Sequence, residues 1–593
     1  MGATVTESAT DPARPLKADP PQPWRPSSSA LNIAAVIGFA APVLGYLMFI
    51  GAYGVNVIWG DQWAAVDVVG HSYNGTLTFG TLWAQINQER MFVPNLLALV
   101  LAHTTHFNQW VEMYLSAALL LGAVALVILA HRRRSPGTHW LWYCPVAILM
   151  LSVVQYENSL TGFQIGWYII LFCLAAAIYL LDTPTLSWTR YGLAAAAGLA
   201  ATFSSIHGLI VWAVGFVLLL QRRRSRVQVL SWLGVTAFAF VAHFADYNFT
   251  LASPHRSYPF HHLWGALQVY FTEIGDVLGF NVGNNGSTTL LLLGLVIFVV
   301  AVLVLVSHGL RFDTDSARPV GVALLVYGLI FPFFAAMGNI YFGLSVSRFS
   351  RMTTYDLLIF VGLYLALVDR VRQPEHDAPP LRARLTPVLG VVLGVMLPIQ
   401  FVAGLTHGIS GGQSYLAGRT TEADVLANYS GLPKDWAEAV VYPFGAPKLV
   451  ERAVRVAERQ RFSLFSTALY TEDRSHGLLL GAWSTRDTSP LHPWQKLRDG
   501  QTIEVKGAGF RPSSAVVLKE CSGGVFRPLK AAGACREDTA VTVSTDGSGA
   551  IDTTIQIYQG NVGNGRCDAQ HACFVQAQYL KHKARVLAEF TLR

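Results

Sequence analysis

Acidic side chains next to long apolar stretches are the first residues of this sequence that could do chemistry. Asp61 directly follows the first apolar run, Glu89 lies in an amphipathic segment, and Glu157 lies between two further apolar runs. A carboxylate in such a place can act as a general base and take the proton of a hydroxyl nucleophile. Asp61, Glu89 and Glu157 are therefore the candidate catalytic residues.

Basic side chains recur near the same ends of the apolar runs. The planar fork of arginine matches phosphate oxygens, and a broken helix usually lines a cavity. Helix capping or snorkelling is the alternative role for each of these cations. The sequence predicts a phosphate-binding set drawn from Arg90, Arg256, Arg348, Arg351 and His207, the last at a break between two apolar runs.

Two other groups of residues raise the question of a metal. His103 and His106 stand three residues apart, and we expect an interfacial pair bonded to backbone rather than a metal site. Asp61, Asp67 and Glu157 could supply hard oxygen ligands to a divalent ion. Because these three carboxylates form no compact Asp-x-Asp, we expect no cofactor and no metal site, with a divalent metal as the alternative.

The elements that must position these residues are membrane helices. Of 593 residues, 52% are hydrophobic and only 13% are charged, and the mean hydropathy is +0.39. Because a span needs about 20 apolar residues, we expect about eleven, some short or fused in pairs. They are 33–57, 109–131, 138–156, 164–181, 190–204, 206–220, 229–247, 287–308, 319–341, 355–369 and 386–407.

The basic runs predict the orientation of these spans. Runs at 131–134, 222–226 and 370–384 fall on one side if the spans alternate, and that side is expected to be cytoplasmic. Residues 1–30, rich in Pro, Ala and Ser, are predicted to be a disordered cytoplasmic N-terminus before an uncleaved anchor. An odd number of spans then puts everything after about residue 408 outside the cytoplasm.

Cysteine usage agrees with this orientation. Cys144 and Cys173 lie in predicted spans, whereas four cysteines lie in the tail that is expected outside, where disulfides persist. Three connectivities are possible for four cysteines, and the two that close short loops are the predicted bridges. These are Cys521–Cys535 and Cys567–Cys573.

The chain therefore divides into a polytopic membrane domain at 31–407 and an extracytoplasmic tail. Residues 408–470 read as helical, with an amphipathic helix at 447–459 that should pack on the outer face of the membrane domain. Residues 471–497, rich in Ser, Gly and Pro, read as a linker. Residues 498–593 alternate as about seven short strands, which predicts an all-β immunoglobulin-like sandwich.

Four short motifs stand out in the membrane part. They are Asp61-Gln62-Trp63, Asn87-Gln88-Glu89-Arg90, Gln155-Tyr156-Glu157-Asn158 and Ser350-Arg351-Met352-Thr353. With them, this part resembles the GT-C superfamily of integral-membrane glycosyltransferases and, within that superfamily, a group of bacterial proteins. Two departures from the pattern of that group are a missing His in the second motif and Met352 in place of a Tyr in the fourth. The resemblance implies transfer of a sugar from a polyprenyl-phosphate donor, with inversion, and a catalytic role for Asp61.

The tail carries a second resemblance. The phrases Asp499 to Phe510, Asp546 to Gly549 and those around the four tail cysteines resemble the neocarzinostatin family, which are secreted seven-stranded proteins with two disulfides that carry enediyne chromophores. Residues that contact a chromophore cannot be matched here, and the domain carries excess Lys and Arg. Because fold does not fix function, we expect carbohydrate or partner binding from it.

These observations favour a transferase embedded in a bacterial cell membrane by many spans. Its expected partners are the lipid bilayer, a polyprenyl-phosphate sugar donor and a cell-envelope polysaccharide or other glycan acceptor, with no nucleic acid. One alternative is a non-enzymatic anchored protein that displays the β domain to bind or sequester a ligand. The other is a transporter or flippase, although no internal repeat is visible.

Overall fold

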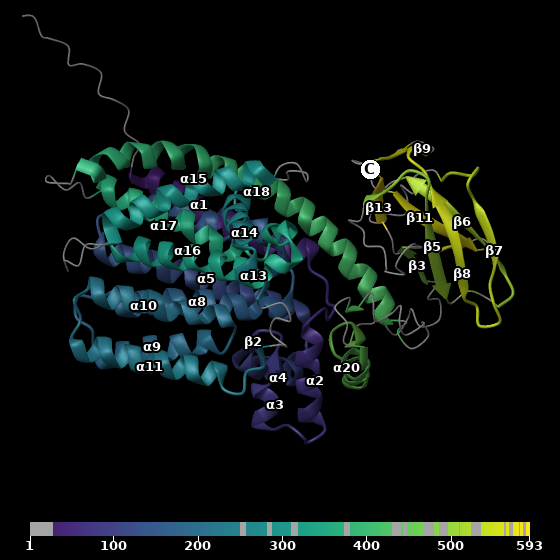
Figure 1. The fold of residues 1–593 in the computed structure, drawn as a ribbon, viewed down its shortest axis with the longest axis horizontal. Helices are drawn as coiled ribbons and strands as arrows, with labels where there is room; N and C mark the ends of the chain where they lie inside the picture. The colour runs from purple at the N-terminus through teal and green to yellow at the C-terminus, as the bar shows by residue number, and fades with distance from the viewer. Residues whose placement is uncertain are drawn as a thin grey trace, which may run out of the picture.

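The structure is a computed structural model of the full chain, drawn in Figure 1. It describes residues 28–249, 257–280, 287–309, 318–372, 380–427, 429, 441–442, 447–466, 479–484, 496–508, 510, 512–522, 535–562, 565–568, 573–579, 582–584 and 589–592.

Helices build nearly all of the described chain up to residue 466. The first half comprises α1 Ser28–Tyr53, α2 Gln62–Tyr73, α3 Phe79–Trp83, α4 Phe92–Thr105, α5 Gln109–Arg134, η1 Trp140–Tyr143, α6 Cys144–Met150, η2 Val153–Gln155, α7 Tyr156–Ser159, η3 Gly162–Gln164, α8 Ile165–Leu181, α9 Trp188–Thr202, η4 Ile206–Leu209, α10 Ile210–Gln221 and α11 Arg226–Phe244. The second half comprises α13 Tyr258–His261, α14 Leu263–Asp276, α15 Ser287–Gly309, α16 Pro319–Asn339, η6 Ile340–Phe342, η7 Leu344–Arg348, α17 Thr353–Arg372, α18 Pro380–Ala427, α20 Pro447–Gln460 and η9 Ser463–Ser466.

Within the described residues, seven helices are long and apolar enough to cross a membrane, so the chain is a multi-pass membrane protein by length and composition. The eleven expected spans are not all of this kind. The segment expected as one span at 138–156 is instead the short pieces η1, α6 and η2. Conversely, α18 runs for 48 residues, well past the expected end at 407.

Side-chain caps fix where several of these helices start. The side chains of Asn108, Ser187 and Ser225 accept bonds from backbone N–H groups in the first turns of α5, α9 and α11. Such caps satisfy donors that have no partner inside the helix. The apolar length of each segment decides that it is a helix, and the cap decides its first residue.

The basic runs meet at one end of the helix bundle. Asp182, which is fully buried at the end of α8, pairs with Arg222 at 2.7 Å and with Arg134 at 3.3 Å. Arg372 donates to the carbonyl of Gly137 at 3.1 Å, which brings the third run to the same place. We call this the arginine-rich end; its assignment to the cytoplasm stays a prediction.

A second hydrophobic core lies at the opposite end, apart from the core of the bundle. It joins α2, α4 and α20 through fully buried residues such as Val66, Val450 and Ala453. Gly70 permits this contact, because a Cβ at that position would lie 2.9 Å from a methyl group of Val456. The amphipathic helix predicted at 447–459 is confirmed as α20, and α2 is the surface on which it packs.

The C-terminal part is a small β domain (Figure 1). One sheet has the strand order β3-β5-β8, a second pairs β9 with β10, and the third has the order β4-β13-β11-β6-β7 with β12 beside β11. Buried residues of both larger sheets form one core. The bounds are β3 Leu479–Ser484, β4 Lys496–Leu497, β5 Gln501–Ala508, β6 Ala515–Ser522, β7 Val541–Ser544, β8 Ile551–Ile557, β9 Gly560–Val562, β10 Gly565–Cys567, β11 Cys573–Tyr579, β12 His582–Ala584 and β13 Glu589–Leu592.

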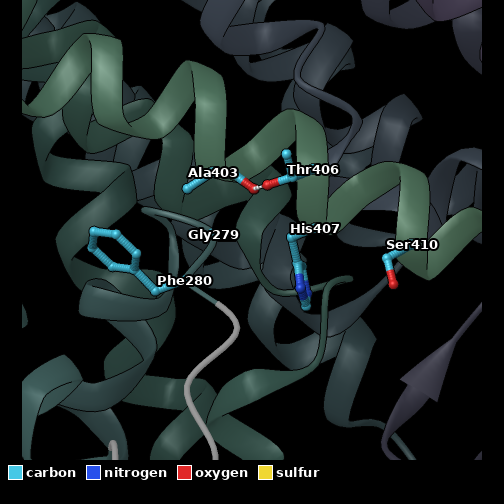
Figure 2. Close-up of a pocket in the computed structure, with 6 residues that line it drawn as sticks. All are labelled: Gly279, Phe280, Ala403, Thr406, His407 and Ser410. Atoms are coloured by element: carbon cyan, nitrogen blue, oxygen red, sulfur yellow. Dashed lines mark hydrogen bonds between the residues drawn. The ribbon is translucent and has the colours of Figure 1, made fainter. Parts of the chain in front are cut away.

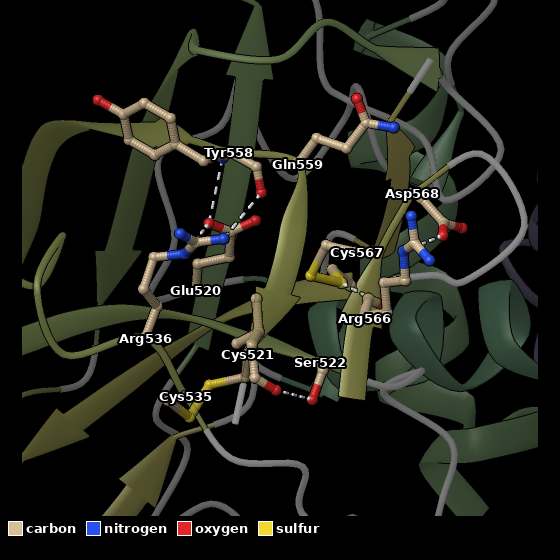
Figure 3. Close-up of a disulfide and its surroundings, with 12 residues drawn as sticks. Glu520, Cys521, Ser522, Cys535, Arg536, Tyr558, Gln559, Arg566, Cys567 and Asp568 are labelled. Carbon is tan, nitrogen blue, oxygen red and sulfur yellow. Dashed lines mark hydrogen bonds and ion pairs between the residues drawn. A yellow bond between two sulfur atoms is a disulfide. The ribbon is translucent and has the colours of Figure 1, made fainter. Parts of the chain in front are cut away.

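Both predicted disulfides are present in this domain. They are Cys521–Cys535 and Cys567–Cys573, and Figure 3 shows the first bridge together with Cys567. Cys144 and Cys173 are free and buried in helices, as expected. The domain starts earlier than the sequence indicated, because β3 falls inside the segment expected as a linker at 471–497 and pairs along its whole length with β5.

Candidate functional site

A short hairpin carries the second sequence motif. Strands β1 (Gln85–Ile86) and β2 (Glu89–Arg90) pair antiparallel, and the two-residue turn between them starts with Asn87 at φ 51°. Asparagine tolerates this left-handed conformation better than most side chains, which suits it to such turns. The hairpin lies at the end of the bundle opposite the arginine-rich end, and it carries Asn87 and Glu89. We call this end, where the hairpin lies, the carboxylate end.

Asp61 lies at that end, just before α2. Its Oδ1 accepts hydrogen bonds from the Tyr442 hydroxyl at 2.7 Å and from Asn87 Nδ2 at 3.3 Å. Burial, reinforced by the Asp61 carboxylate, raises the pKa of Tyr442, so this phenol stays protonated and keeps donating. Both bonds end on Oδ1, so Tyr442 and Asn87 together fix the orientation of the Asp61 carboxylate.

Glu89 lies nearby and meets the helix break that contains His207. Its Oε2 accepts from the backbone N–H of Ile206 at 2.6 Å, and the Ser205 hydroxyl bonds in turn to His207 Nδ1 at 3.0 Å. Burial raises the pKa of the Glu89 carboxyl to about 7; bonds from Ile206 and Ser205 oppose the rise, and the charge of Asp61 adds to it. A carboxyl with a pKa near neutrality can both give and take a proton. Asp61, Asn87, Glu89, Ser205 and His207 form the carboxylate site.

Arg90, on the same hairpin, serves a different purpose. It is 3% exposed and donates through Nε to the carbonyl of His243 at 2.6 Å and through Nη1 to that of Trp83 at 2.8 Å. Nη2 bonds the carbonyl of Ala245. The guanidinium thus caps the free carbonyls at the end of α11 and ties the hairpin to it. We assign Arg90 to structure rather than to phosphate binding.

The third and fourth motifs, almost 200 residues apart, bind each other. Glu157 Oε2 accepts from the backbone N–H of Arg351 at 3.1 Å, and Asn158 Nδ2 donates to the carbonyl of the same residue at 2.8 Å. The Thr354 hydroxyl donates to Gln155 Oε1 at 2.9 Å. Glu157 therefore holds the backbone of the arginine-bearing loop, and this positioning contact is the role that the geometry gives it.

That loop lies beside a pocket on α18. Arg348 is near enough to Asp276 and His407 to act on both electrostatically, and His407 Nδ1 has no hydrogen-bond partner among the described residues. The pocket has a volume of about 260 Å³, and Figure 2 shows the six residues that line it. They are Gly279, Phe280, Ala403, Thr406, His407 and Ser410; we call this the α18 pocket.

A line of rings joins the α18 pocket to the loop before α2. The ring centroid of His407 lies 5.9 Å from that of Tyr156, which lies 6.3 Å from that of Tyr415. The Arg419 guanidinium lies 4.6 Å from the Tyr415 ring and 3.6 Å from the ring of Trp59. Trp59 stands two residues before Asp61, so α18 ties the pocket and the carboxylate site together.

Glycines on α18 and a buried ion pair make this connection tight. A Cβ on Gly411 would clash with the ring of Tyr156, and a Cβ on Gly408 would clash with the backbone of Val153 in η2. Beyond them, Arg419 pairs with the buried Glu422 at 2.5 Å, and Trp59 also bonds that carboxyl. The long extension of α18 therefore fixes the loop that carries Asp61.

The remaining predicted residues are placed as follows. Arg256 lies outside the described residues. Arg351 has its guanidinium 4.5 Å from the ring of Phe349. The ring centroid of His103 lies 4.5 Å from that of Tyr73, and its Nε2 lies 3.3 Å from the Ser72 hydroxyl, which is a side-chain partner rather than the expected backbone one.

A divalent ion does not fit this donor set. Asp67, one of the possible oxygen ligands, pairs with Arg452 at 3.3 Å instead. Nowhere in the described ranges do three or more His, Cys, Asp or Glu side chains gather as a metal would need. We derive no step through a metal.

Sequence reasoning missed Tyr442, Arg419 and Glu422. Each follows the membrane domain by sequence and returns to contact the loop before α2, between 350 and 390 residues earlier. An Arg and a Glu three residues apart on a polar extension of a helix predict a solvent-exposed ion pair. No local pattern distinguishes that case from a buried pair.

Comparison with known proteins identifies the tail. Residues 491–589 match the Neocarzinostatin family, which confirms the resemblance seen in the sequence. No curated protein matches the chain. Macromomycin is a structural neighbour of this part, at 20% identity over 18% of this chain and 93% of its own, with a TM-score of 0.14.

A second solved structure is similar to most of the chain. It is ArnT from Cupriavidus metallidurans bound to undecaprenyl phosphate, at 13% identity over 77% of this chain and 94% of that one, with a TM-score of 0.39. At these identities and scores, neither of the two structural likenesses carries an argument about this protein.

Proposed function

We propose that the chain is a membrane glycosyltransferase that moves a sugar from a polyprenyl-phosphate donor to a glycan acceptor of the cell envelope. The single observation that carries this proposal is the carboxylate site. Asp61, whose Oδ1 is held by Tyr442 and Asn87, lies near the carboxyl of Glu89, whose pKa is about 7, at the carboxylate end of a membrane helix bundle. A lipid headgroup and a water-soluble acceptor can meet at that level.

Asp61 is the general base of the proposed reaction. Its Oδ2 takes the proton of an acceptor hydroxyl while that oxygen attacks the anomeric carbon of the donor sugar. The bond from that carbon to the phosphate oxygen breaks, and the electron pair leaves with the polyprenyl phosphate. Attack from the face opposite the phosphate inverts the anomeric centre. The Tyr442 hydroxyl and Asn87 orient the carboxylate through Oδ1.

The donor phosphate is assigned to the α18 pocket. Arg348 and His407 stand beside it, and Arg351 follows on the same loop. Arg348 offers the fork of donors that suits phosphate, and stabilising the leaving phosphate lowers the barrier. His207 belongs to the carboxylate site, where its bond to Ser205 favours a role in orienting Glu89.

The β domain is proposed to hold acceptor or partner outside the cytoplasm. The domain has its own hydrophobic core and two disulfides, which support a folded unit. Disulfides persist in an oxidising compartment, which is consistent with a place outside the cytoplasm. On this proposal the arginine-rich end faces the cytoplasm and the carboxylate end faces outward. A protein that only displayed this domain would need one span, whereas the described part of the chain has seven helices long and apolar enough to cross a membrane and an organised polar end.

Covalent transfer in a defined system tests the proposal. The purified full chain, in lipid vesicles, is supplied with polyprenyl-phosphate sugars and a bacterial envelope glycan fraction, and sugar incorporation and free polyprenyl phosphate are measured together. The proposal predicts that both products appear in equal amounts. Movement of the donor across the bilayer without transfer would favour the flippase alternative, and glycan binding without either product would favour the anchored binder.

A further inference from the structure

The outward face of α20 carries an unbroken row of cations. Lys448, Arg452, Arg455 and Arg459 are all exposed, and their spacing of four, three and four residues puts them on one side of the helix. The row is about 16 Å long, at 1.5 Å per residue. Arg461, also exposed, follows directly after the helix. We call these five residues the α20 basic stripe.

The opposite face of α20 is already fully used. Val450, Ala453, Val454 and Ala457 are buried against α2, at 0–2% exposure. An amphipathic helix that lies on a membrane needs its apolar face free for the lipid. Because the apolar face of α20 has a protein partner, its basic face is left to bind something dissolved in water.

Exposed apolar side chains of the same region lie on other helices. Phe79 of α3 is 64% exposed, and Leu96 and Val100 of α4 are 39% and 56% exposed. By contrast, the described exposed residues of α20 are all charged. The side of this region that suits lipid is therefore the α3–α4 side rather than the basic stripe.

Carboxylates near the stripe do not neutralise it. Arg455 pairs with Glu451 and Arg452 with Asp67, yet both arginine side chains remain more than half exposed, at 52% and 59%. Exposed ion pairs of this kind contribute little to stability, so an anionic ligand can replace the carboxylate partner. The sequence from 447 to 461 contains the five cations and only two carboxylates, so the face stays basic.

The stripe belongs to the same unit as the candidate base. α20 packs on α2, which begins directly after Asp61, and the Ser463 hydroxyl beyond α20 bonds Asn56 Oδ1 at 3.1 Å, before Asp61. The chain just ahead of α20 supplies Tyr442, which bonds Asp61. A polymer lying along the stripe would thus be held by the same rigid packing that orients the base.

We propose that the α20 basic stripe binds an anionic polysaccharide, and that this polymer is the acceptor. This inference rests on the proposed function. A polymer with a carboxylate or phosphate on successive residues complements four cations in a row, and arginine pairs well with either group. Binding along the stripe keeps the growing end or a side hydroxyl of the polymer close to Asp61 and slows its escape between transfers.

Polymer binding by the full chain in zwitterionic nanodiscs tests this inference. The probes are polygalacturonate, which carries carboxylates, poly(glycerol phosphate), which carries phosphates, and uncharged dextran. The test variant combines Lys448→Gln, Arg455→Gln and Arg459→Gln. The matched control removes three exposed arginines from the opposite end of the bundle, at Arg190, Arg223 and Arg226, and so changes the net charge equally.

The wild type and the control variant should bind one anionic probe alike, and the test variant should bind it about tenfold more weakly with a smaller salt dependence. Which probe binds identifies the anionic group. Equal binding by the test variant and the wild type, or stripe-dependent binding to anionic vesicles in place of both polymers, overturns the inference.

The Asp61→Asn variant separates this inference from the proposed function. It should bind the polymer as the wild type does. If the stripe binds the polymer but the wild type transfers no sugar, the proposed function fails and the surface remains a glycan site. If sugar is transferred and the test variant transfers it as well as the wild type at limiting polymer, only the acceptor inference fails.

Discussion

Glu520 offers a sharp test of how the β domain is held together. This β6 side chain is fully buried; its Oε2 accepts from the backbone N–H of Tyr558 at 3.1 Å and lies 3.4 Å from Arg536 Nε (Figure 3). Oε1 has no partner among the described residues. Burial raises the pKa of Glu520 to about 7. The bond from Tyr558 and the charge of Arg536 lower this pKa, whereas the charges of Asp499 and Asp538 raise it further.

The direction of the pH effect follows from that shift. Because the pKa in the folded domain exceeds the ordinary value of 4.5, the contribution to stability is complete below about pH 4.5 and is lost as the pH rises through 7. At about 1.4 kcal/mol per pKa unit the loss is at most about 3.5 kcal/mol. Solvent screening near Arg536, which is 18% exposed, should reduce it to about 1–2 kcal/mol.

Chemical denaturation of the isolated oxidised domain measures this loss. The fragment should begin at about residue 475, so that β3 can pair with β5. Its free energy of unfolding should fall between pH 5 and pH 8, and Glu520→Gln should remove most of that fall. Glu537→Gln is the control, since this exposed carboxylate pairs with Lys519 at the surface. A wild type that gains stability over this range, or a Glu520→Gln variant that loses as much stability as the wild type, would show that the buried Glu520 carboxyl does not cause the loss.

Three further outcomes are expected in the membrane part. Arg90→Ala should lower the free energy of unfolding by about 2 kcal/mol or more, because it leaves three backbone carbonyls without the Arg90 donors. A thermal melt measures this loss, and a raised KM for the donor at unchanged stability would contradict the structural role of Arg90. Arg348→Ala should raise the donor KM about tenfold with a smaller change in kcat, and an unchanged KM would remove the phosphate from the α18 pocket. Gly411→Leu should push Tyr156 away and lower activity at least as much as Tyr156→Ala does, and wild-type turnover by the glycine variant would count against the ring connection.

Features that depend on local pattern could be predicted from the sequence. The length of an apolar run predicts the bounds of helices such as α5 and α15 to within a few residues, because both lipid and a buried core require apolar side chains along the helix. The spacing of apolar and charged residues predicts α20, and loop length predicts both disulfides. Each of these features is decided within a short stretch of chain.

Features that depend on distant partners could not be predicted. Arg90 follows the candidate residue Glu89 in sequence, yet only the end of α11 shows that its donors are occupied. β3 is short and follows Gly- and Ser-containing chain, so its pairing with β5 is invisible locally. Tyr442 reaches Asp61 across more than 380 residues, and no periodic pattern encodes such a contact.

The central claim is that Asp61 is the base of a sugar transfer from a lipid-linked phosphate. The most direct measurement is kcat for transfer by Asp61→Asn beside Asp67→Asn, which removes a carboxylate six residues away that pairs with Arg452. Both variants should fold and enter the membrane like the wild type. Asp61→Asn should lower kcat at least about 100-fold, the usual contribution of general base catalysis, and Asp67→Asn should change it little. Transfer by Asp61→Asn at the wild-type rate would show that Asp61 is not the base.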